Sequence, residues 1–514
     1  MQTTPASAGS VTAPQRGTGR KVLIIVQNLP VPFDRRVWQE ASELAANGYQ
    51  VAVICPIGRG HAARYECIDA IHIYRHPLPL EGNGTWGYLL EYSSSLFWEF
   101  RLACKVLRRH GFDVIHACNP PDNIFLIGGF FKLFARKRFL FDHHDINPEL
   151  YEAKFGRRDF FYRIMLLWER LTFRVADVSI ATNESYRRIA IERGRMAPDK
   201  VFVVRSGPSL ERLRILDPDP RRRKGRRFLV GYVGVMGQQE GIPYLVEAAH
   251  HVVHTLRRTD VQFALVGGGP ALEEMRKMVR ERGLADYIDF TGRVSDQTLL
   301  EVLNTADLCV NSDEVNPMND KSTMNKIMEY MALGKPIVQF ELAEGRYSAG
   351  EASVYAKPND ALDMARHIVA LLDDPAKREA MGRFGRKRVE TELAWPYEAP
   401  RLLAAYDEVF RGSKSATATT PARSRGSARA ERPDAVAEEI PQQDETGGTH
   451  LRKNVIPTGA HHKSHERGVE QHSDASQQHK PQHGAAVTAV AAKRESIVQQ
   501  VVGHGAERKS DRRG

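Results

Sequence analysis

Residues Lys21–Pro56 read KVLIIVQNLPVPFDRRVWQEASELAANGYQVAVICP. The segment begins with a continuous apolar run rich in β-branched side chains, which favours a buried strand. After the turn, Val37, Ala41 and Leu44 recur at helical spacing before Gly48 ends the helix. A second apolar run closes the segment. The stretch therefore predicts a strand–helix–strand unit, the building block of a parallel α/β sheet.

The same alternation continues along the chain in two series. The first contains the apolar segments DVIHA, KRFLFD, DVSIATN and KVFVVRSG. The second contains RRFLVGYVG, VQFALVGGG, YIDFTGR, ADLCVNS, KPIVQF and ASVYA, again with helix-length segments between them. Short apolar strands alternating with helices predict parallel sheets covered on both faces. We expect an α/β fold with two tandem Rossmann-like, doubly wound domains whose carboxyl strand ends face a shared cleft.

Changes in composition predict where these parts begin and end. After Arg411 the chain turns polar, and such a segment cannot bury enough apolar surface to offset chain entropy. The expected parts are a disordered leader (1–20), an N-terminal domain (21–207), a linker (208–226), a C-terminal domain (227–392), a helix returning to the N-terminal domain (393–411) and a disordered tail (412–514).

Charge and cysteine content exclude some classes of protein. The net charge of +10 is partly local, as in the cluster at Arg221–Arg227, and no nucleic-acid module accompanies it. We therefore expect no nucleic-acid partner. The N-terminus lacks the apolar core of a secretory signal, and the five cysteines are odd in number and scattered. These features predict a cytoplasmic protein with free thiols.

A dinucleotide-binding enzyme is the first alternative for two Rossmann-like domains. That function requires G-x-G-x-x-G directly after the first strand, whereas the turn here is QNLPVPFDRR, without glycine. The first strand of the second domain leads into GYVGVMGQQEGI. Its Gly234 and Gly237 suit the close approach of a ligand, but their spacing is not the dinucleotide pattern. A dehydrogenase is therefore disfavoured.

Several segments, in this order, resemble family-4 glycosyltransferases of the GT-B architecture. They are FDRRVWQEASELAANGYQVAVICP, FDHHDINPELY, TNESYRRIAIERG, VVRSGP, VGGGPALEEM, IDFTGRV and MNKIMEYMALGKPIV. The resemblance implies a hexosyltransferase that moves a sugar from a UDP- or GDP-sugar to a glycan or lipid-linked acceptor. It also implies retention of configuration, no metal or other cofactor, and a role in exopolysaccharide or cell-envelope glycan synthesis. The donor would bind the C-terminal domain and the acceptor the N-terminal domain.

The turn NDKSTMN at residues 319–325 is the candidate donor-phosphate site. Without a metal, cations and helix N-terminal amides must stabilise the charge that develops on the leaving phosphate. Lys321 and Lys326 are the candidate cations. Asp320, Ser322 and Thr323 are available as helix caps, and the two hydroxyl residues are also candidates for donor binding.

Two further donor residues follow in the same region. The resemblance gives Glu329 the ribose hydroxyls; the open alternative is an exposed pair with Lys326. Arg346 is a second candidate cation, and its alternative is a salt bridge within its loop.

The sequence also departs from the family pattern. Where many members have an acid eight residues before Glu329, this chain has Lys321, and where many have phosphate-binding cations it has Val235 and Glu240. Lys326 therefore becomes the main phosphate candidate. These departures keep open a non-catalytic sugar-nucleotide-binding subunit. A sugar-nucleotide 2-epimerase also stays open, because that class of enzyme shares the two-domain architecture.

The N-terminal domain supplies the candidate catalytic residues. By resemblance, His144 in DHHDINPE faces the reacting centre, with Asp145 and Glu149 close behind. Alternatively, the histidine satisfies buried backbone groups and Glu149 only starts a helix. Asp34 and Arg35, after the first strand, are candidates for acceptor or phosphate contact, or form a helix start.

Three segments combine aromatic residues with Lys and Arg: LLEYSSSLFWEFRLACKVLRRHGF, GGFFKLFARKRFLF and FGRRDFFYRIMLLWERLTFR. Apolar insertion and attraction to anionic lipids would add together on such a surface. This pattern suggests peripheral contact at the inner face of a membrane. The alternative, that the aromatics are helix core covering the sheet, stays open.

Overall fold

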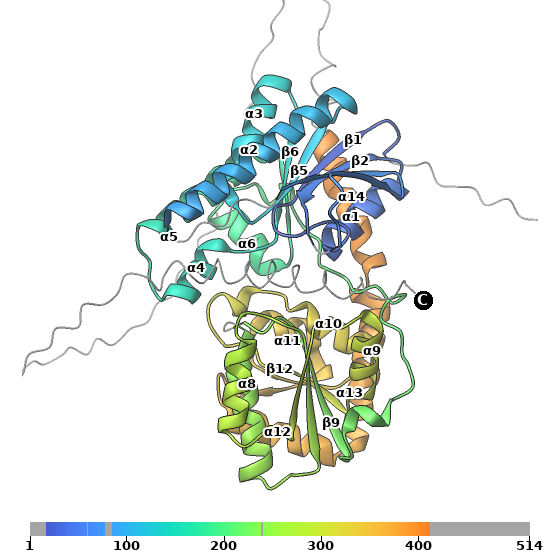
Figure 1. Ribbon diagram of the computed structural model, residues 1–514. Helices are drawn as coiled ribbons and strands as arrows, with labels where there is room; N and C mark the ends of the chain where they lie inside the picture. The colour runs from blue at the N-terminus through green and yellow to red at the C-terminus, as the bar shows by residue number, and fades with distance from the viewer. Residues whose placement is uncertain (1–16, 59, 78–84, 238–239, 412–514) are drawn as a thin grey trace, which may run out of the picture. The chain divides into compact units, whose positions relative to one another are not determined.

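The computed structural model describes residues 17–411 apart from 59, 78–84 and 238–239. Within these residues the chain forms two α/β halves, each built on one sheet with helices on both faces (Figure 1). This is the predicted pair of Rossmann-like folds. The predicted tail at 412–514 and most of the predicted leader lie outside the described residues.

The N-terminal half contains an eight-stranded sheet in the order β3-β4-β2-β1-β5-β6-β7-β8. All neighbouring strands are parallel except β3 and β4, which form an antiparallel pair at one edge. The strands are β1 (Lys21–Ile25), β2 (Gln50–Pro56), β3 (Tyr65–Ile68), β4 (Ile71–His76), β5 (Val114–Cys118), β6 (Arg138–His143), β7 (Val178–Ala181) and β8 (Val201–Val203).

Two apolar layers cover this sheet. One layer joins it to helices α1 and α14, and the other joins it to α2, α3, α5 and α6. The helices are α1 (Arg35–Ala46), α2 (Thr85–Arg109), α3 (Phe125–Ala135), α4 (Asn147–Phe155), α5 (Phe160–Val175), α6 (Glu184–Glu192) and α14 (Trp395–Arg411). The last helix of the described chain thus contributes to the core of the first sheet, through buried residues such as Leu402 and Tyr406.

The C-terminal half contains a six-stranded parallel sheet in the order β11-β10-β9-β12-β13-β14. Its strands are β9 (Phe228–Val233), β10 (Val261–Val266), β11 (Ile288–Gly292), β12 (Leu308–Asn311), β13 (Ile337–Phe340) and β14 (Ser353–Ala356). Its helices are α7 (Ile242–His250), α8 (Leu272–Glu281), α9 (Asp296–Thr305), α10 (Asn325–Ala332), α11 (Ala343–Ala349), α12 (Ala361–Asp373) and α13 (Pro375–Arg388). Helices α7, α8 and α12 pack on one face, and α9 and α10 on the other.

Strand order places the polar loops of each half together. In both sheets the central strands are nearly fully buried, as expected for parallel strands covered on both sides. Their carboxyl ends lead into the loops before α1, α4, α7 and α10. In an open parallel sheet this edge is where ligands bind.

Candidate functional site

A pocket of about 320 Å³ lies where loops after strands of both sheets meet. Four of the predicted site residues line it: His144, Asp145, Ser322 and Thr323. The complete lining is Arg36, His144, Asp145, Thr182, Tyr186, Ser206, Glu240, Met318, Asn319, Ser322, Thr323, Met324 and Asn325.

His144 stands at the edge of this pocket on a buried carboxylate. Its Nε2 lies 2.5 Å from Asp142 Oδ2 and 2.9 Å from Arg36 Nε. The loop that carries it is fixed by Asn119, whose Oδ1 accepts hydrogen bonds from the backbone N–H groups of His144 (2.6 Å) and Asp145 (3.1 Å). The Asn119 amide also donates to the Asp145 carbonyl at 2.6 Å. Ring and backbone are therefore both held in place.

Beneath His144, the buried guanidinium of Arg36 lies between two buried carboxyl groups, those of Asp142 and Glu40. The Arg36 guanidinium lies 3.0 Å from Asp142 and 3.1 Å from Glu40, and both acids are fully buried. Burial alone would raise the pKa of Asp142, but Arg36 and the two neighbouring histidines outweigh burial and lower that pKa well below its usual value. For Glu40 burial dominates and raises the pKa well above its usual value. These shifts favour a charged Asp142 as the partner of Arg36 and the protonated form of Glu40.

His116 extends this cluster to the last described helix. Its Nε2 lies 3.3 Å from Asp142 Oδ2, and its Nδ1 lies 2.8 Å from the Tyr406 hydroxyl on α14. Burial lowers the pKa of His116, which favours the neutral ring. A polar chain therefore runs from α14 through the first sheet to His144.

Glu149 lies on α4 and belongs to a second ion cluster. Both of its carboxylate oxygens accept from Arg193, at 2.7 and 3.1 Å, and Lys321 Nζ lies 3.5 Å away. Burial opposes ionisation, but the Arg193 hydrogen bonds outweigh it and lower the pKa of Glu149. Arg193 also binds Glu169, whose pKa burial raises to about 7. The structure thus gives Glu149 an ion pair and brings Lys321 to it.

The start of α10 differs from the prediction. Asp320, Ser322 and Thr323 were expected as caps, but the N-cap is Met324, which makes no side-chain cap hydrogen bond. Asp320 accepts instead from the backbone N–H of Ala343, at 2.8 Å. Met324 forms no cap because a thioether side chain does not supply the carboxylate or hydroxyl oxygen of an ordinary N-cap.

The hydroxyl groups of Ser322 and Thr323 form hydrogen bonds with groups outside α10. The Ser322 hydroxyl donates to the Met318 carbonyl at 2.8 Å, and Thr323 accepts from the Asn183 amide at 3.0 Å. The first amides of α10 therefore lack a side-chain cap, and Met324 and Asn325 line the pocket. Uncapped amides at a helix start attract anions.

Lys326 is placed in an ion cluster of the C-terminal half. Its Nζ lies 3.0 and 3.1 Å from the two Asp313 oxygens and 3.3 Å from Glu240, and only 10% of its side chain is exposed. Burial disfavours the ammonium, but Asp313 outweighs it and raises the pKa of Lys326. Burial also disfavours the charged form of Asp313, and it raises the pKa of this carboxyl to about 7. Two carboxylates thus compete for one ammonium, so Lys326 is already neutralised.

Glu329 faces two arginines instead of Lys326. Arg212 and Arg35 both donate to Glu329 Oε1, Arg35 at 3.5 Å. Asp296 joins the same group, with its Oδ1 2.8 Å from Arg35 and 3.6 Å from Arg212. The simple exposed Lys326–Glu329 pair is thus replaced by a four-membered ionic cluster of Arg35, Arg212, Asp296 and Glu329.

The remaining predicted residues lie around or away from the pocket. Asp34 is the N-cap of α1, and burial raises its pKa. Gly234 and Gly237 follow β9, and a Cβ on Gly234 would lie 2.5 Å from the Tyr232 hydroxyl. Arg346 is half exposed on α11, where it binds Glu341 at 2.6 Å. The structure does not bring Arg346 together with the pocket residues.

Among the residues that the structure describes, two groups of side chains bring ligand-type atoms within 4.8 Å of one another: His116, Cys118 and Asp142, and Glu40, Asp142 and His144. Asp142 belongs to both groups. The Arg36 guanidinium already forms an ion pair with this carboxylate, so a side chain of the protein balances the negative charge of Asp142.

Family models match both halves of the chain. The model described as Glycosyltransferase Family 4 matches residues 34–212, and that described as Glycosyl transferases group 1 matches residues 227–374. The chain is a family-4-like glycosyltransferase of the GT-B fold. The predicted resemblance is confirmed at this level.

Individual relatives share this assignment with different coverage. Alpha-D-kanosaminyltransferase of Streptomyces kanamyceticus is 30% identical over 36% of this chain and 46% of its own length, so the alignment spans about half of that relative. MMP alpha-(1->4)-mannosyltransferase of Mycolicibacterium hassiacum is 24% identical over 72% of this chain and 92% of its own. The structure of Anabaena HepE in complex with UDP-glucose matches with a TM-score of 0.57 and 16% identity, covering 77% of this chain and 99% of that one. The last likeness shows the fold.

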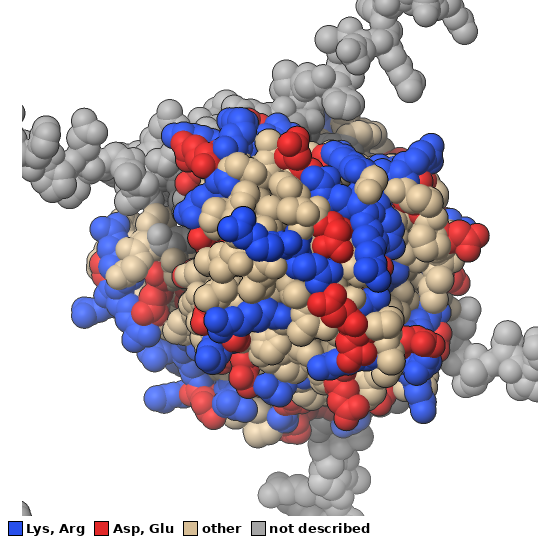
Figure 2. All heavy atoms as spheres, turned by 90° about the horizontal axis from the view of Figure 1, so that it is seen from below, with Lys and Arg blue, Asp and Glu red and all other residues tan. Residues whose placement is uncertain are grey.

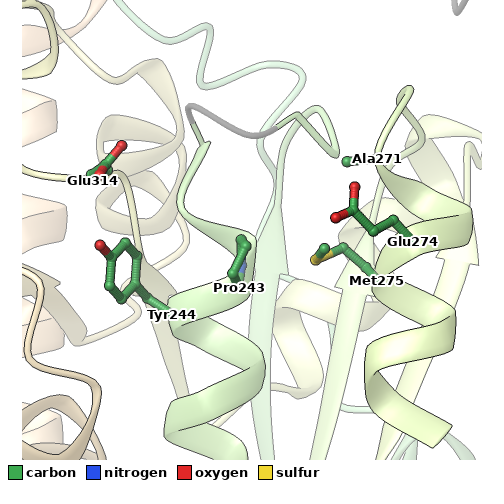
Figure 3. A pocket seen from close by; sticks show the side chains of 6 residues that line it. All are labelled: Pro243, Tyr244, Ala271, Glu274, Met275 and Glu314. Carbon is green, nitrogen blue, oxygen red and sulfur yellow. The ribbon is translucent and has the colours of Figure 1, made fainter. Parts of the chain in front are cut away.

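A second pocket in this GT-B protein, of about 300 Å³, has a different character (Figure 3). It lies at the starts of α7 and α8, and Glu274 and Glu314 point toward it from opposite sides, with Tyr244 beside the second acid. Its lining contains two carboxylates and no Lys or Arg. A diphosphate would be repelled there. The pocket beside His144 also contains two carboxylates, Asp145 and Glu240, but Arg36 and the uncapped start of α10 line it as well, so it is the candidate donor site.

Sequence reasoning missed most of the partners that hold the site. Arg36, Glu40 and Leu44 share one helical column, so the spacing that placed Leu44 inward also pointed Arg36 and Glu40 inward. A charged pair on an apolar helix face was therefore an available signal. For Arg193 and Arg212 the sequence offers no comparable signal, because their partners lie 44 and 117 residues away.

Proposed function

We propose that this chain transfers a hexosyl group from a UDP- or GDP-sugar to a glycan or lipid-linked acceptor, with retention and without a metal. The observation that carries this proposal is one pocket lined both by the uncapped start of α10 and by His144. The fold match to HepE, which is described in complex with UDP-glucose, supports a nucleotide-sugar donor. The expected setting is exopolysaccharide or cell-envelope glycan synthesis.

The α10 amides are the proposed phosphate site. Charge builds up on the diphosphate as the sugar bond breaks, and preorganised N–H donors stabilise it without reorganisation. The helix dipole adds in the same direction. Lys326 supports this site indirectly, because its ammonium is bound by Asp313 and Glu240 rather than presented to the pocket.

Glu329 is the proposed ribose ligand. Both arginine contacts fall on Oε1, which leaves Oε2 to accept a ribose hydroxyl. Arg212 then has a positioning role, since it fixes the carboxylate that the ribose meets. His144 is the proposed residue at the reacting sugar, oriented by Asp142.

Thermal unfolding of the full chain against UDP-, GDP-, ADP- and TDP-sugars tests donor binding. A donor present at a hundred times its dissociation constant adds about 2.7 kcal/mol of stability. We expect Glu329→Gln to remove this shift and the exposed Glu281→Gln on α8 to retain it. If no nucleotide sugar stabilises the wild-type chain, the proposal is wrong.

Transfer itself needs a second measurement. The purified chain is incubated with the stabilising donor and lipid-linked or free glycan acceptors, and the anomeric configuration of the product is read by NMR. Retained configuration is the expected result, and an inverted product contradicts the retaining mechanism. Donor turnover to an epimeric sugar without acceptor would instead show the 2-epimerase.

The neutralised Lys326 favours one other candidate, a non-catalytic sugar-nucleotide-binding subunit. A phosphate cation that is already paired contributes less to leaving-group stabilisation than a free one. In that case the donor would stabilise the wild-type chain, and Glu329→Gln would abolish the effect, yet no acceptor would be glycosylated. The two measurements together distinguish the candidates.

A further inference from the structure

Exposed apolar side chains are concentrated on one side of the N-terminal half. Of the fourteen large hydrophobic residues that are exposed among the described residues, eight lie on α2, α3 and α5. They are Phe97, Leu126, Phe130, Leu133, Phe134, Phe160, Phe161 and Leu167. A single exposed hydrophobe is ordinary on a protein surface, but a concentration of them indicates an interaction site.

The centre of this surface is one face of α3, which we name the α3 stripe: Leu126, Phe130, Leu133 and Phe134. The spacing of these residues places them along one side of the helix, while Phe131 and Ile127 face the core. Leu133 is 74% exposed and Phe134 is 71% exposed. The stripe thus presents side chains that the fold of the N-terminal half does not need to bury.

Helices α2 and α5 flank the stripe on the same side of the sheet (Figure 1). Phe100 of α2 packs edge-to-face against Phe130 at 4.9 Å between ring centroids. On the other flank, Lys132 of α3 donates to the Val175 carbonyl of α5 at 2.7 Å. The three helices therefore form one continuous outer layer.

The charges of this layer have one sign. In residues 93–109 of α2, in α3 and in α5, the only acids are Glu99 and Glu169, and both are buried. The exposed charged residues of these segments are Arg101, Lys105, Arg108, Arg109, Arg163, Arg170 and Arg174. By contrast, the face seen in Figure 2 carries acidic and basic side chains side by side. The chain as a whole has 63 acids against 73 basic residues, so composition does not explain the asymmetry.

We propose that the α3 stripe and the flanking basic side chains of α2 and α5 bind the surface of an anionic lipid bilayer. Apolar side chains would enter the region between headgroups and acyl chains, and the Lys and Arg side chains would meet lipid phosphates. The contact is peripheral: among the helices described here, none is long and apolar enough to span a membrane. A bilayer suits a surface that is both apolar and uniformly cationic, whereas a protein partner would also need matched acidic side chains.

Vesicle co-sedimentation of the full chain tests this proposal without donor or acceptor, so its outcome is independent of glycosyl transfer. We expect binding to vesicles of phosphatidylcholine mixed with phosphatidylglycerol, and weak binding to phosphatidylcholine alone. Leu133→Ser/Phe134→Ser should lower the partition coefficient at least about tenfold. The matched control Ile215→Ser/Tyr397→Ser, exposed elsewhere, should leave it unchanged.

The charge contribution is tested separately. Arg101→Gln/Arg170→Gln should weaken binding to the anionic vesicles by about fivefold per side chain, and the effect should shrink with added salt. Arg221→Gln/Lys277→Gln, exposed on the C-terminal half, is the control with the same change in net charge.

Three outcomes would overturn the proposal. One is equal binding of the Leu133→Ser/Phe134→Ser variant and the wild type. Another is equal binding to neutral and anionic vesicles. The third is concentration-dependent self-association without lipid that this variant loses, because a second copy of the chain would then cover the stripe. Circular dichroism of each variant checks that the highly exposed substitutions leave the fold intact.

Discussion

Asp142 and Glu40 are two fully buried carboxylates on one guanidinium, and replacing each by its amide should have opposite consequences. Asp142 is the ionised partner, so Asp142→Asn leaves Arg36 buried without its counter-charge. Breaking a buried ion pair from one side costs about 3–5 kcal/mol. Glu40 is held protonated by burial, and Gln has the shape and neutrality of a protonated Glu. Below about pH 4, where glutamate is also protonated in the unfolded chain, Glu40→Gln should therefore change stability by less than about 1 kcal/mol.

The pH dependence of the two variants has opposite sign. The folded-state pKa of Asp142 is depressed, so its contribution is present above the unfolded value near 4 and is lost as pH falls through the folded value. The folded-state pKa of Glu40 is raised, so the wild type loses stability as pH rises above about 4.5. Relative to the wild type, Glu40→Gln should therefore become more stable as pH rises.

Hydrogen exchange in urea, followed in peptides from β1 and β6, measures the unfolding of the N-terminal half by itself. The expected result at neutral pH is a gap of at least about 2 kcal/mol between the two variants. Equal costs for Asp142→Asn and Glu40→Gln would refute the assignment of charge within the cluster. A larger loss of stability in Glu40→Gln than in Asp142→Asn would also refute this assignment.

Three further changes test other parts of the structure. Lys326→Met should destabilise the C-terminal half by about 3 kcal/mol because Asp313 stays buried without its cation, and adding Asp313→Asn should restore most of the loss in urea unfolding. Gly241→Ala should lower the melting temperature by several degrees, because Gly241 has φ +61° and an added Cβ would overlap the Ser312 carbonyl oxygen; unchanged melting would contradict this geometry. Burial raises the pKa of Glu99 to about 8, so wild-type stability should fall between about pH 4.5 and 8, by up to ~1.4 kcal/mol per pH unit. Glu99→Gln should make that slope shallower by this contribution, and a slope equal to that of the wild type would contradict the titration of Glu99.

The fold was largely predictable because parallel strands buried on both faces leave continuous apolar runs in the sequence. β1, β2 and β5 are such strands, and each was predicted. The edge pair β3 and β4 was not. Its outer strand alternates between exposed and partly buried residues over only four positions, which is too short a pattern to separate from a loop.

Site residues could be predicted only where their place in the fold depends on their position in the sequence relative to a strand. His144 and Asp145 directly follow a strand, so their place at the ligand-binding edge came from the order of elements. The state of each charge depends on distant partners. Lys326 was a plausible free cation in the sequence, and only the fold places Asp313 and Glu240 against it.

The departures from the family pattern and the ion cluster around Lys326 have one physical explanation. Glu240 stands where many family members have a cation, and the fold pairs it with Lys326 at 3.3 Å. Asp313 binds the same ammonium, so under the proposed function the lysine would keep two nearby carboxylates compatible with a donor diphosphate. Without that ammonium the carboxylates would repel the phosphate across a low-dielectric site. In the proposed donor complex the lysine thus cancels negative charge beside the α10 amides, and those uncapped amides are the proposed direct phosphate ligands.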